Sequence, residues 1–73
     1  MLEKGKYYIV DLGYKFKNSL VLAEYGDEVR IDDNILIGYS VKPINVIKDK
    51  CGWAKDSIGY NICVDIEQIK EVK

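Results

Sequence analysis

Closely spaced turn signals divide this chain into short runs rich in valine, isoleucine and tyrosine, and this pattern constrains its fold more than any other feature. Glycine, proline, asparagine and aspartate favour turns, whereas β-branched and aromatic residues favour strands. Short β-type runs separated in this way are typical of a small all-β barrel or sandwich. The sequence therefore predicts a mostly β fold. The turn signals lie at Gly13, Asn18-Ser19, Gly26-Asp27, Asp32-Asp33-Asn34, Gly38, Lys42-Pro43, Asp49-Lys50, Gly52 and Gly59.

The runs between the turns give the expected strands, which span residues 6–12, 28–31, 35–41, 44–48 and 60–64. The third and fourth runs are separated because Pro43 lacks a backbone N–H and does not fit inside a central strand. In the last run, Tyr60, Ile62 and Val64 are expected to face inward because alternate side chains of a strand share one face.

Two segments contain helical signals. Residues 19–25 fit a strand, but they fit a helix capped by Asn18 and ended by Gly26 almost as well, so both alternatives stay open. Near the C-terminus, apolar residues recur every third position over 66–72, and the Asp-x-x-Gln pattern at 65–68 has the form of a capping box. We expect a short helical or 3-10 turn there, after which the chain pairs back as a final strand or frays.

The length and charge of the chain bound its organisation and its partners. With 73 residues it has room for one domain, which we expect to span residues 1–73. Its formal net charge of −1 lacks the basic excess that nucleic-acid-binding modules use to neutralise phosphates, so nucleic acid is a disfavoured partner. The longest apolar run, residues 20–23, is too short to span a bilayer, and no apolar leader follows the charged N-terminus. We therefore expect a cytoplasmic protein that does not attach to membranes.

The chain contains no histidine, which excludes imidazole bases, Ser-His and Cys-His nucleophile pairs and imidazole metal ligands. Tyrosine, aspartate and lysine show no recognisable acid–base spacing. We therefore expect no enzymatic activity, no metal and no cofactor. Cys51 and Cys63 favour reduced thiols in a cytosolic protein, with one disulfide as the alternative.

Two segments resemble an SH3-type barrel, as found in SH3 and bacterial SH3-type domains. Residues 20–31 (LVLAEYGDEVRI) are similar to the SH3 diverging turn, where an apolar strand meets a Gly-Asp turn and then a strand of the form x-Val-x-Ile. Residues 52–60 (GWAKDSIGY) and 65–69 (DIEQI) are similar to the SH3 pattern of Gly-Trp on one strand, a tight distal hairpin, Gly-Tyr on the next strand and a 3-10 turn before the last strand. The resemblance implies a small SH3-like barrel of five to seven short strands with a short helical or 3-10 turn near the C-terminus, and it puts Trp53 at the groove-tryptophan position.

The chain also departs from this family. The proline and tyrosine of a proline-ligand groove are absent, and Ile62, Cys63 and Val64 occupy that region. Residues 35–50 form an extra segment between the two matches, which is expected to add a hairpin. The resemblance therefore implies the fold rather than binding of Pro-x-x-Pro ligands.

Aromatic residues beside lysines are the candidate contact residues. Trp53 is the only tryptophan, and tryptophan is enriched at interfaces, although a half-buried core position is the alternative. Tyr14 and Phe16 alternate with lysines in an expected loop, where they either contact a partner or cover one end of the barrel. Nearby lysines complete the predicted partner-binding set, which is Trp53, Tyr14, Phe16, Lys48, Lys50 and Lys55.

These residues predict a non-catalytic protein–protein interaction module, such as an accessory subunit, a regulator or an inhibitor, whose partner is another protein. The alternative is a small nucleic-acid-binding β-barrel that would use the same lysines together with Lys15 and Lys17. The acidic stretch 27–33 lacks the spacing of an EF-hand loop and predicts a solvated acidic face. Homodimerisation through an open sheet edge stays an alternative.

Overall fold

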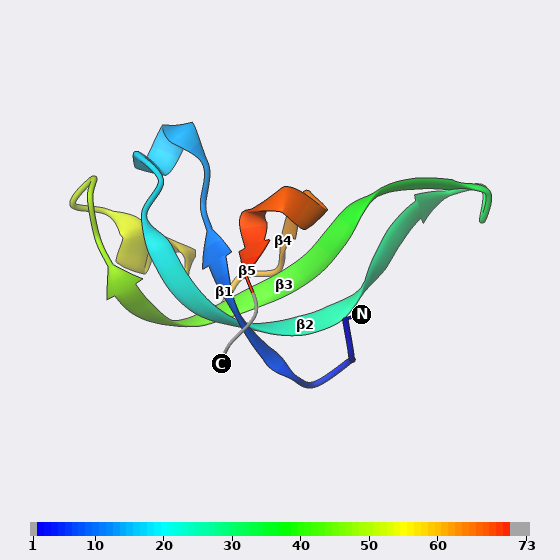
Figure 1. The fold of residues 1–73 in the computed structure, drawn as a ribbon, viewed down its shortest axis with the longest axis horizontal. Helices are drawn as coiled ribbons and strands as arrows, with labels where there is room; N and C mark the ends of the chain where they lie inside the picture. Colours follow the sequence, from blue (N-terminus) through cyan, green and yellow to red (C-terminus); the bar gives the residue numbers. More distant parts are fainter. Residues whose placement is uncertain (1, 71–73) are drawn as a thin grey trace.

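The computed structural model describes residues 2–70, which form an antiparallel sheet with strand order β4-β3-β2-β1-β5 (Figure 1). The sheet is open, and short 3-10 turns connect its strands. The mostly β class predicted from the sequence is confirmed. The strands are β1 (Tyr7–Asp11), β2 (Leu20–Ile31), β3 (Ile35–Lys48), β4 (Ile62–Val64) and β5 (Ile69–Lys70), and the 3-10 turns are η1 (Tyr14–Phe16), η2 (Ala54–Ser57) and η3 (Ile66–Gln68).

A long hairpin of β2 and β3 dominates the fold. These strands contain 12 and 14 residues and pair along their whole length, so they are longer than the short runs expected from the sequence. The chain reverses where Asp32 and Asp33 both have positive φ, which aspartate tolerates better than most side chains. The far part of the hairpin, residues 28–38, lies beyond the residues that pair with β1 and β4, and only its base at Gly38 contacts β4. This part is called the arm below (Figure 1).

The ambiguous segment 19–25 belongs to β2 from Leu20 onward, so the strand alternative is correct and the helix alternative is wrong. The expected turn at Gly26 and Asp27 is also wrong. Tyr25 pairs with Val41 and Asp27 pairs with Ser40, which leaves Gly26 without a partner in the ladder. A β-bulge therefore absorbs the glycine, and the strand continues instead of reversing.

The predicted break at Pro43 is wrong as well, because β3 runs through the proline as one strand and no extra hairpin forms. The Pro43 carbonyl accepts a hydrogen bond of 2.9 Å from the Gly59 N–H, which lies outside the β2–β3 pair. The N and O of one strand residue point to the same side, so the missing N–H of Pro43 also faces away from β2. The proline therefore removes no hydrogen bond between β2 and β3.

The C-terminal prediction is confirmed. Asp65 and Gln68 form a capping box around η3, and β5 then pairs with β1. The Gln68 Nε2 donates a hydrogen bond of 2.9 Å to the carbonyl oxygen of Asp11, which ties this turn to the end of β1. Residue 72, the last position of the expected apolar spacing, lies outside the described residues.

The connection between β3 and β4 differs from the sequence-based expectation. Gly52 and Trp53 lie in a loop before η2 rather than on a strand. Tyr60 precedes β4 and is mostly exposed, so its predicted inward position is wrong, whereas Val64 is buried as expected. The short strand β4 pairs only with residues 39–41 of β3.

A thin apolar core lies between the central strands and the segments that fold over them. Most of its members are valine and alanine, which fit the narrow space available in so small a protein. The buried core consists of Val10, Leu12, Val21, Ala23, Tyr25, Val41, Ala54 and Val64. The arm contributes no side chain to this core.

Candidate functional site

Two opposite regions of the sheet present exposed apolar or aromatic side chains. The loop end consists of the β1–β2 connection (residues 12–19) and the β3–β4 connection (residues 49–61). The arm end consists of the arm and the neighbouring turn η3. In Figure 1 the arm points away from η1 and from the loop that follows β3.

Ser19 joins the two connections of the loop end. It is fully buried, and its Oγ donates a hydrogen bond of 2.6 Å to the carbonyl oxygen of Phe16. The same Oγ accepts a hydrogen bond of 2.8 Å from the backbone N–H of Lys50. This hydroxyl therefore holds η1 beside the loop that carries Trp53.

Asp49 shapes that loop from within. Its Oδ1 accepts hydrogen bonds from the backbone N–H groups of Gly52, at 2.7 Å, and Cys51, at 3.0 Å. These donors, led by that of Gly52, hold the pKa of the Asp49 carboxyl below its usual value, because they stabilise the charged form. The loop is therefore an ordered turn built around a carboxylate.

The predicted aromatic residues lie at the loop end but differ in exposure. Tyr14 is 81% exposed and Trp53 is 44% exposed, so both offer contact area. Phe16 instead packs against the core as a partly buried side chain, which matches the alternative of an aromatic covering one end of the sheet. Sequence reasoning therefore located two exposed aromatics and one structural aromatic.

The predicted lysines are all exposed and lie in this end or directly beside it. Lys48 ends β3, Lys50 follows it, and Lys55 lies on η2. Lys15 and Lys17 lie on and directly after η1, on the neighbouring connection. The loop end therefore carries four lysines, Lys15, Lys17, Lys50 and Lys55, against the two aspartates Asp49 and Asp56. The open question of a disulfide is also resolved, because Cys51 and Cys63 are both free.

The arm end was not predicted as a contact surface, although it carries a concentration of exposed aliphatic side chains. These side chains are between 40% and 58% exposed, whereas large aliphatic residues are usually buried. They lie on both strands of the arm and on η3. The residues are Ile31, Ile35, Leu36, Ile37 and Ile66.

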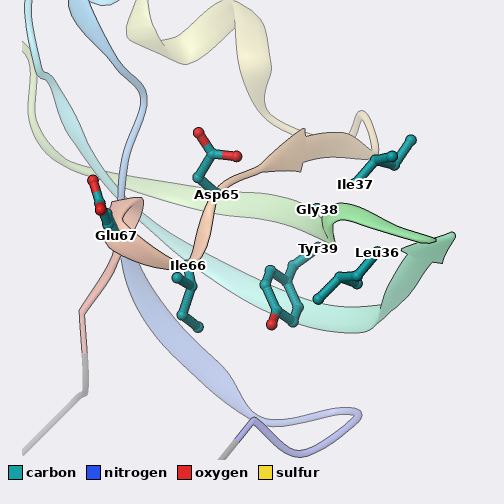
Figure 2. A pocket seen from close by; sticks show the side chains of 7 residues that line it. All are labelled: Leu36, Ile37, Gly38, Tyr39, Asp65, Ile66 and Glu67. Atoms are coloured by element: carbon teal, nitrogen blue, oxygen red, sulfur yellow. The ribbon is translucent and has the colours of Figure 1, made fainter. Parts of the chain in front are cut away.

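Between the arm and η3 lies an open groove of about 320 Å³. Figure 2 shows the side chains of Leu36, Tyr39 and Ile66 on one side of β3, whereas Ile37 points to the other side. Asp65 and Glu67 also line the groove, and Figure 2 shows their carboxylates pointing away from the side on which Ile66 lies. The groove thus combines an apolar wall with two acidic side chains.

An aromatic row lies beside the groove. The ring of Tyr39 lies 6.1 Å from that of Tyr25, and the ring of Tyr25 lies 6.5 Å from that of Tyr8. Burial raises the pKa of Tyr25 above its ordinary value, and the carboxylates of Glu28 and Asp27 raise it further. The phenol therefore stays neutral at physiological pH and serves as packing behind the groove.

Bulges explain why several isoleucines of β3 are exposed. The consecutive β2 residues Val29 and Arg30 pair with Gly38 and Leu36 of β3. Ile37, which lies between these two partners, therefore has no partner in the ladder. The same arrangement leaves Ile44 and Ile47 unpaired, and all three isoleucines are exposed. Each bulge shifts the alternation of inward and outward side chains, so a simple strand pattern does not reveal the exposed positions.

Comparisons with protein-family models, curated proteins and solved structures find no match to this chain. Within residues 2–70, no helix has the length and apolar character needed to cross a membrane.

Proposed function

We propose that this protein is a non-catalytic protein–protein interaction module. The observation that carries the proposal is the exposed aliphatic cluster of the arm end. Large aliphatic side chains are usually buried, so their exposure on both faces of the arm is what we would expect of a contact site for another macromolecule. An accessory subunit, a regulator or an inhibitor would each use a surface of this kind, and a cytoplasmic location remains our expectation.

We further propose that the domain is SH3-like. Support comes from its five antiparallel strands and from the 3-10 turn η3 that directly precedes the last strand. Two features differ from the SH3 pattern that the sequence resembles. A bulge at Gly26 stands where the diverging turn was expected, and Trp53 lies in a loop rather than on a strand. The contact surface we favour is accordingly the arm end, with the Trp53 surface of the loop end as a second one.

Capture of partners from a lysate of the source organism tests this function. The bait is the full chain, compared with Ile37→Lys, Ile47→Lys and Trp53→Ala, each checked for an unchanged fold by circular dichroism. Ile37 and Ile47 are both bulge residues of β3, exposed by 47% and 50%, so they form a matched pair at opposite ends. We expect nuclease-resistant capture that is lost with Ile37→Lys and kept with Ile47→Lys. A bait that retains no protein would contradict the proposal.

A second candidate function is binding of nucleic acid at the loop end. One observation favours it: exposed lysines on both connections accompany Tyr14 and Trp53, at a distance from the acidic turn of the arm. Phosphate contacts lose affinity steeply as salt rises, so titration of single-stranded and double-stranded oligonucleotides at several salt concentrations tests this function. Affinity that falls with salt and with Lys50→Glu would support it, whereas no binding at low salt would exclude it.

A further inference from the structure

The outer edge of β3 is open along the arm. On its inner side β3 pairs with β2 to the end of the hairpin, whereas β4 covers only residues 39–41 on the outer side. The chain leaves the sheet after Val64 and turns into η3. The outer edge of residues 35–38 is therefore not paired in the ladder by any described strand, and only Gly38, at its inner end, is buried against Cys63 and Val64.

Apart from the bulge at Ile37, this edge lacks the protection that natural sheet edges carry. Residues 35–38 read Ile-Leu-Ile-Gly and contain no charged residue and no proline. Natural proteins place lysine, proline or an inward-pointing charge at exposed edges to prevent another chain from pairing there. An apolar edge of this kind, next to a groove, is suited to accept a strand from a partner.

The charges around the edge define the partner. The arm end and the η3 cap residue Asp65 together carry five carboxylates, and the single guanidinium among the arm residues, that of Arg30, forms an ion pair of 2.6 Å with Glu28. A second copy docking with its own arm end would bring these carboxylates together, which disfavours symmetric self-association. A basic segment would instead be attracted. The carboxylates belong to Glu28, Asp32, Asp33, Asp65 and Glu67.

We propose that residues 35–38 of β3 accept an extended segment of a partner protein, in which aliphatic residues alternate with lysine or arginine, as an added antiparallel strand. Side chains of a strand point alternately to its two faces. The aliphatic side chains of the segment pack on Leu36, Tyr39 and Ile66, and its basic side chains reach Asp65 and Glu67 (Figure 2). This inference rests on the proposed function, since it names the partner chemistry of the same surface.

A displayed library of random linear peptides, selected on the full chain, tests this inference. The expected result is enrichment of peptides in which aliphatic residues alternate with lysine or arginine. A synthetic copy of an enriched peptide should bind about tenfold more weakly to Ile37→Lys or Leu36→Ser, and equally well to Ile47→Lys. Asp65→Asn combined with Glu67→Gln should reduce the salt dependence of its affinity, because fewer charge pairs would remain.

Three results would overturn the inference: no enrichment above empty beads, enrichment of acidic peptides, or enriched peptides that bind Ile37→Lys and Leu36→Ser as well as they bind wild type. Self-association of the pure chain in analytical ultracentrifugation, abolished by Ile37→Lys, would overturn it in favour of a second copy. If lysate capture depends on Trp53 while the library fails, the interaction function survives and only this inference falls.

Discussion

The loop end and the arm end of this small sheet are held in place by different forces. At the loop end, Ser19 and Asp49 satisfy backbone groups with their side chains, and Ile58 is exposed beside the exposed aromatics. In the arm, the hairpin ladder with one exposed ion pair maintains the structure, and aliphatic side chains face solvent. The difference indicates that polar residues build the shape of one end, whereas the other end exposes aliphatic surface, which we propose a partner covers.

The largest expected effect on stability concerns the junction between the arm and the rest of the sheet. A Cβ at Gly38 would lie 2.5 Å from the Cys63 Sγ and 3.0 Å from the carbonyl oxygen of Val64. Gly38→Ala should therefore push β4 away and reduce the free energy of unfolding by about 1–3 kcal/mol, measured by urea denaturation.

The matched control is Gly26→Ala, because a Cβ there would make only an ordinary contact, 3.5 Å from the carbonyl oxygen of Ser40. Adding Cys63→Ala to Gly38→Ala should recover part of the lost free energy of unfolding, because it removes the sulfur that the new Cβ would contact. Equal stability of the two glycine variants would show that β4 does not pack on Gly38 as described.

The next largest effect concerns the hydrogen bonds of Ser19, which hold the two connections of the loop end together. Ser19→Ala removes the hydroxyl that joins Phe16 to Lys50, so it should reduce the free energy of unfolding by about 1 kcal/mol. Hydrogen exchange should accelerate at the Lys50 amide and stay unchanged in the arm. Acceleration spread evenly over the chain would argue against a separate loop end.

A pH-dependent effect is expected from Asp49. Because its pKa is lowered in the folded protein, its carboxylate contributes stability above the ordinary aspartate pKa of about 3.9, and this contribution is lost as pH falls through the lower folded value. The amide resonances of Cys51 and Gly52 should therefore shift as pH falls through this lowered value. Asp49→Asn should remove this transition, and its persistence in that variant would assign it to another group.

The smallest expected effect on stability is at the proposed contact surface. Ile37→Lys changes an exposed side chain that has no ladder partner, so the free energy of unfolding should change by about 0.5 kcal/mol or less. Thermal denaturation measures this change. A large destabilisation would mean that Ile37 supports the fold rather than a partner.

Local patterns of the sequence predicted much of the fold. The Asp-x-x-Gln box produced η3, and the tyrosine and valine of residues 7–11 produced β1. The predictions failed where tertiary pairing overrode a local signal. The bulge at Gly26 absorbed an expected turn, and because the backbone N of Pro43 faces away from β2, the strand continues through a residue that usually interrupts one.

The candidate sites were predictable to a smaller extent. Trp53 and Tyr14 were found because exposed aromatics in loops have a recognisable composition. The arm was missed because isoleucine in an expected strand is ordinarily a core residue, and its exposure at Ile37 follows from a bulge and from the short reach of β4. Neither the bulge nor the short length of β4 can be predicted from local sequence alone. One signal was available in the sequence: residues 35–38 form an uncharged, mostly apolar run just after the acidic turn at residues 32–33.

Hydrogen exchange of the whole chain, with and without a captured or selected partner, tests most directly whether the arm end is the contact surface. We predict that bound partner slows exchange at residues 35–38 and 65–67 and leaves residues 49–53 unchanged. Slower exchange confined to residues 49–53 would contradict this account and assign binding to the loop end around Trp53.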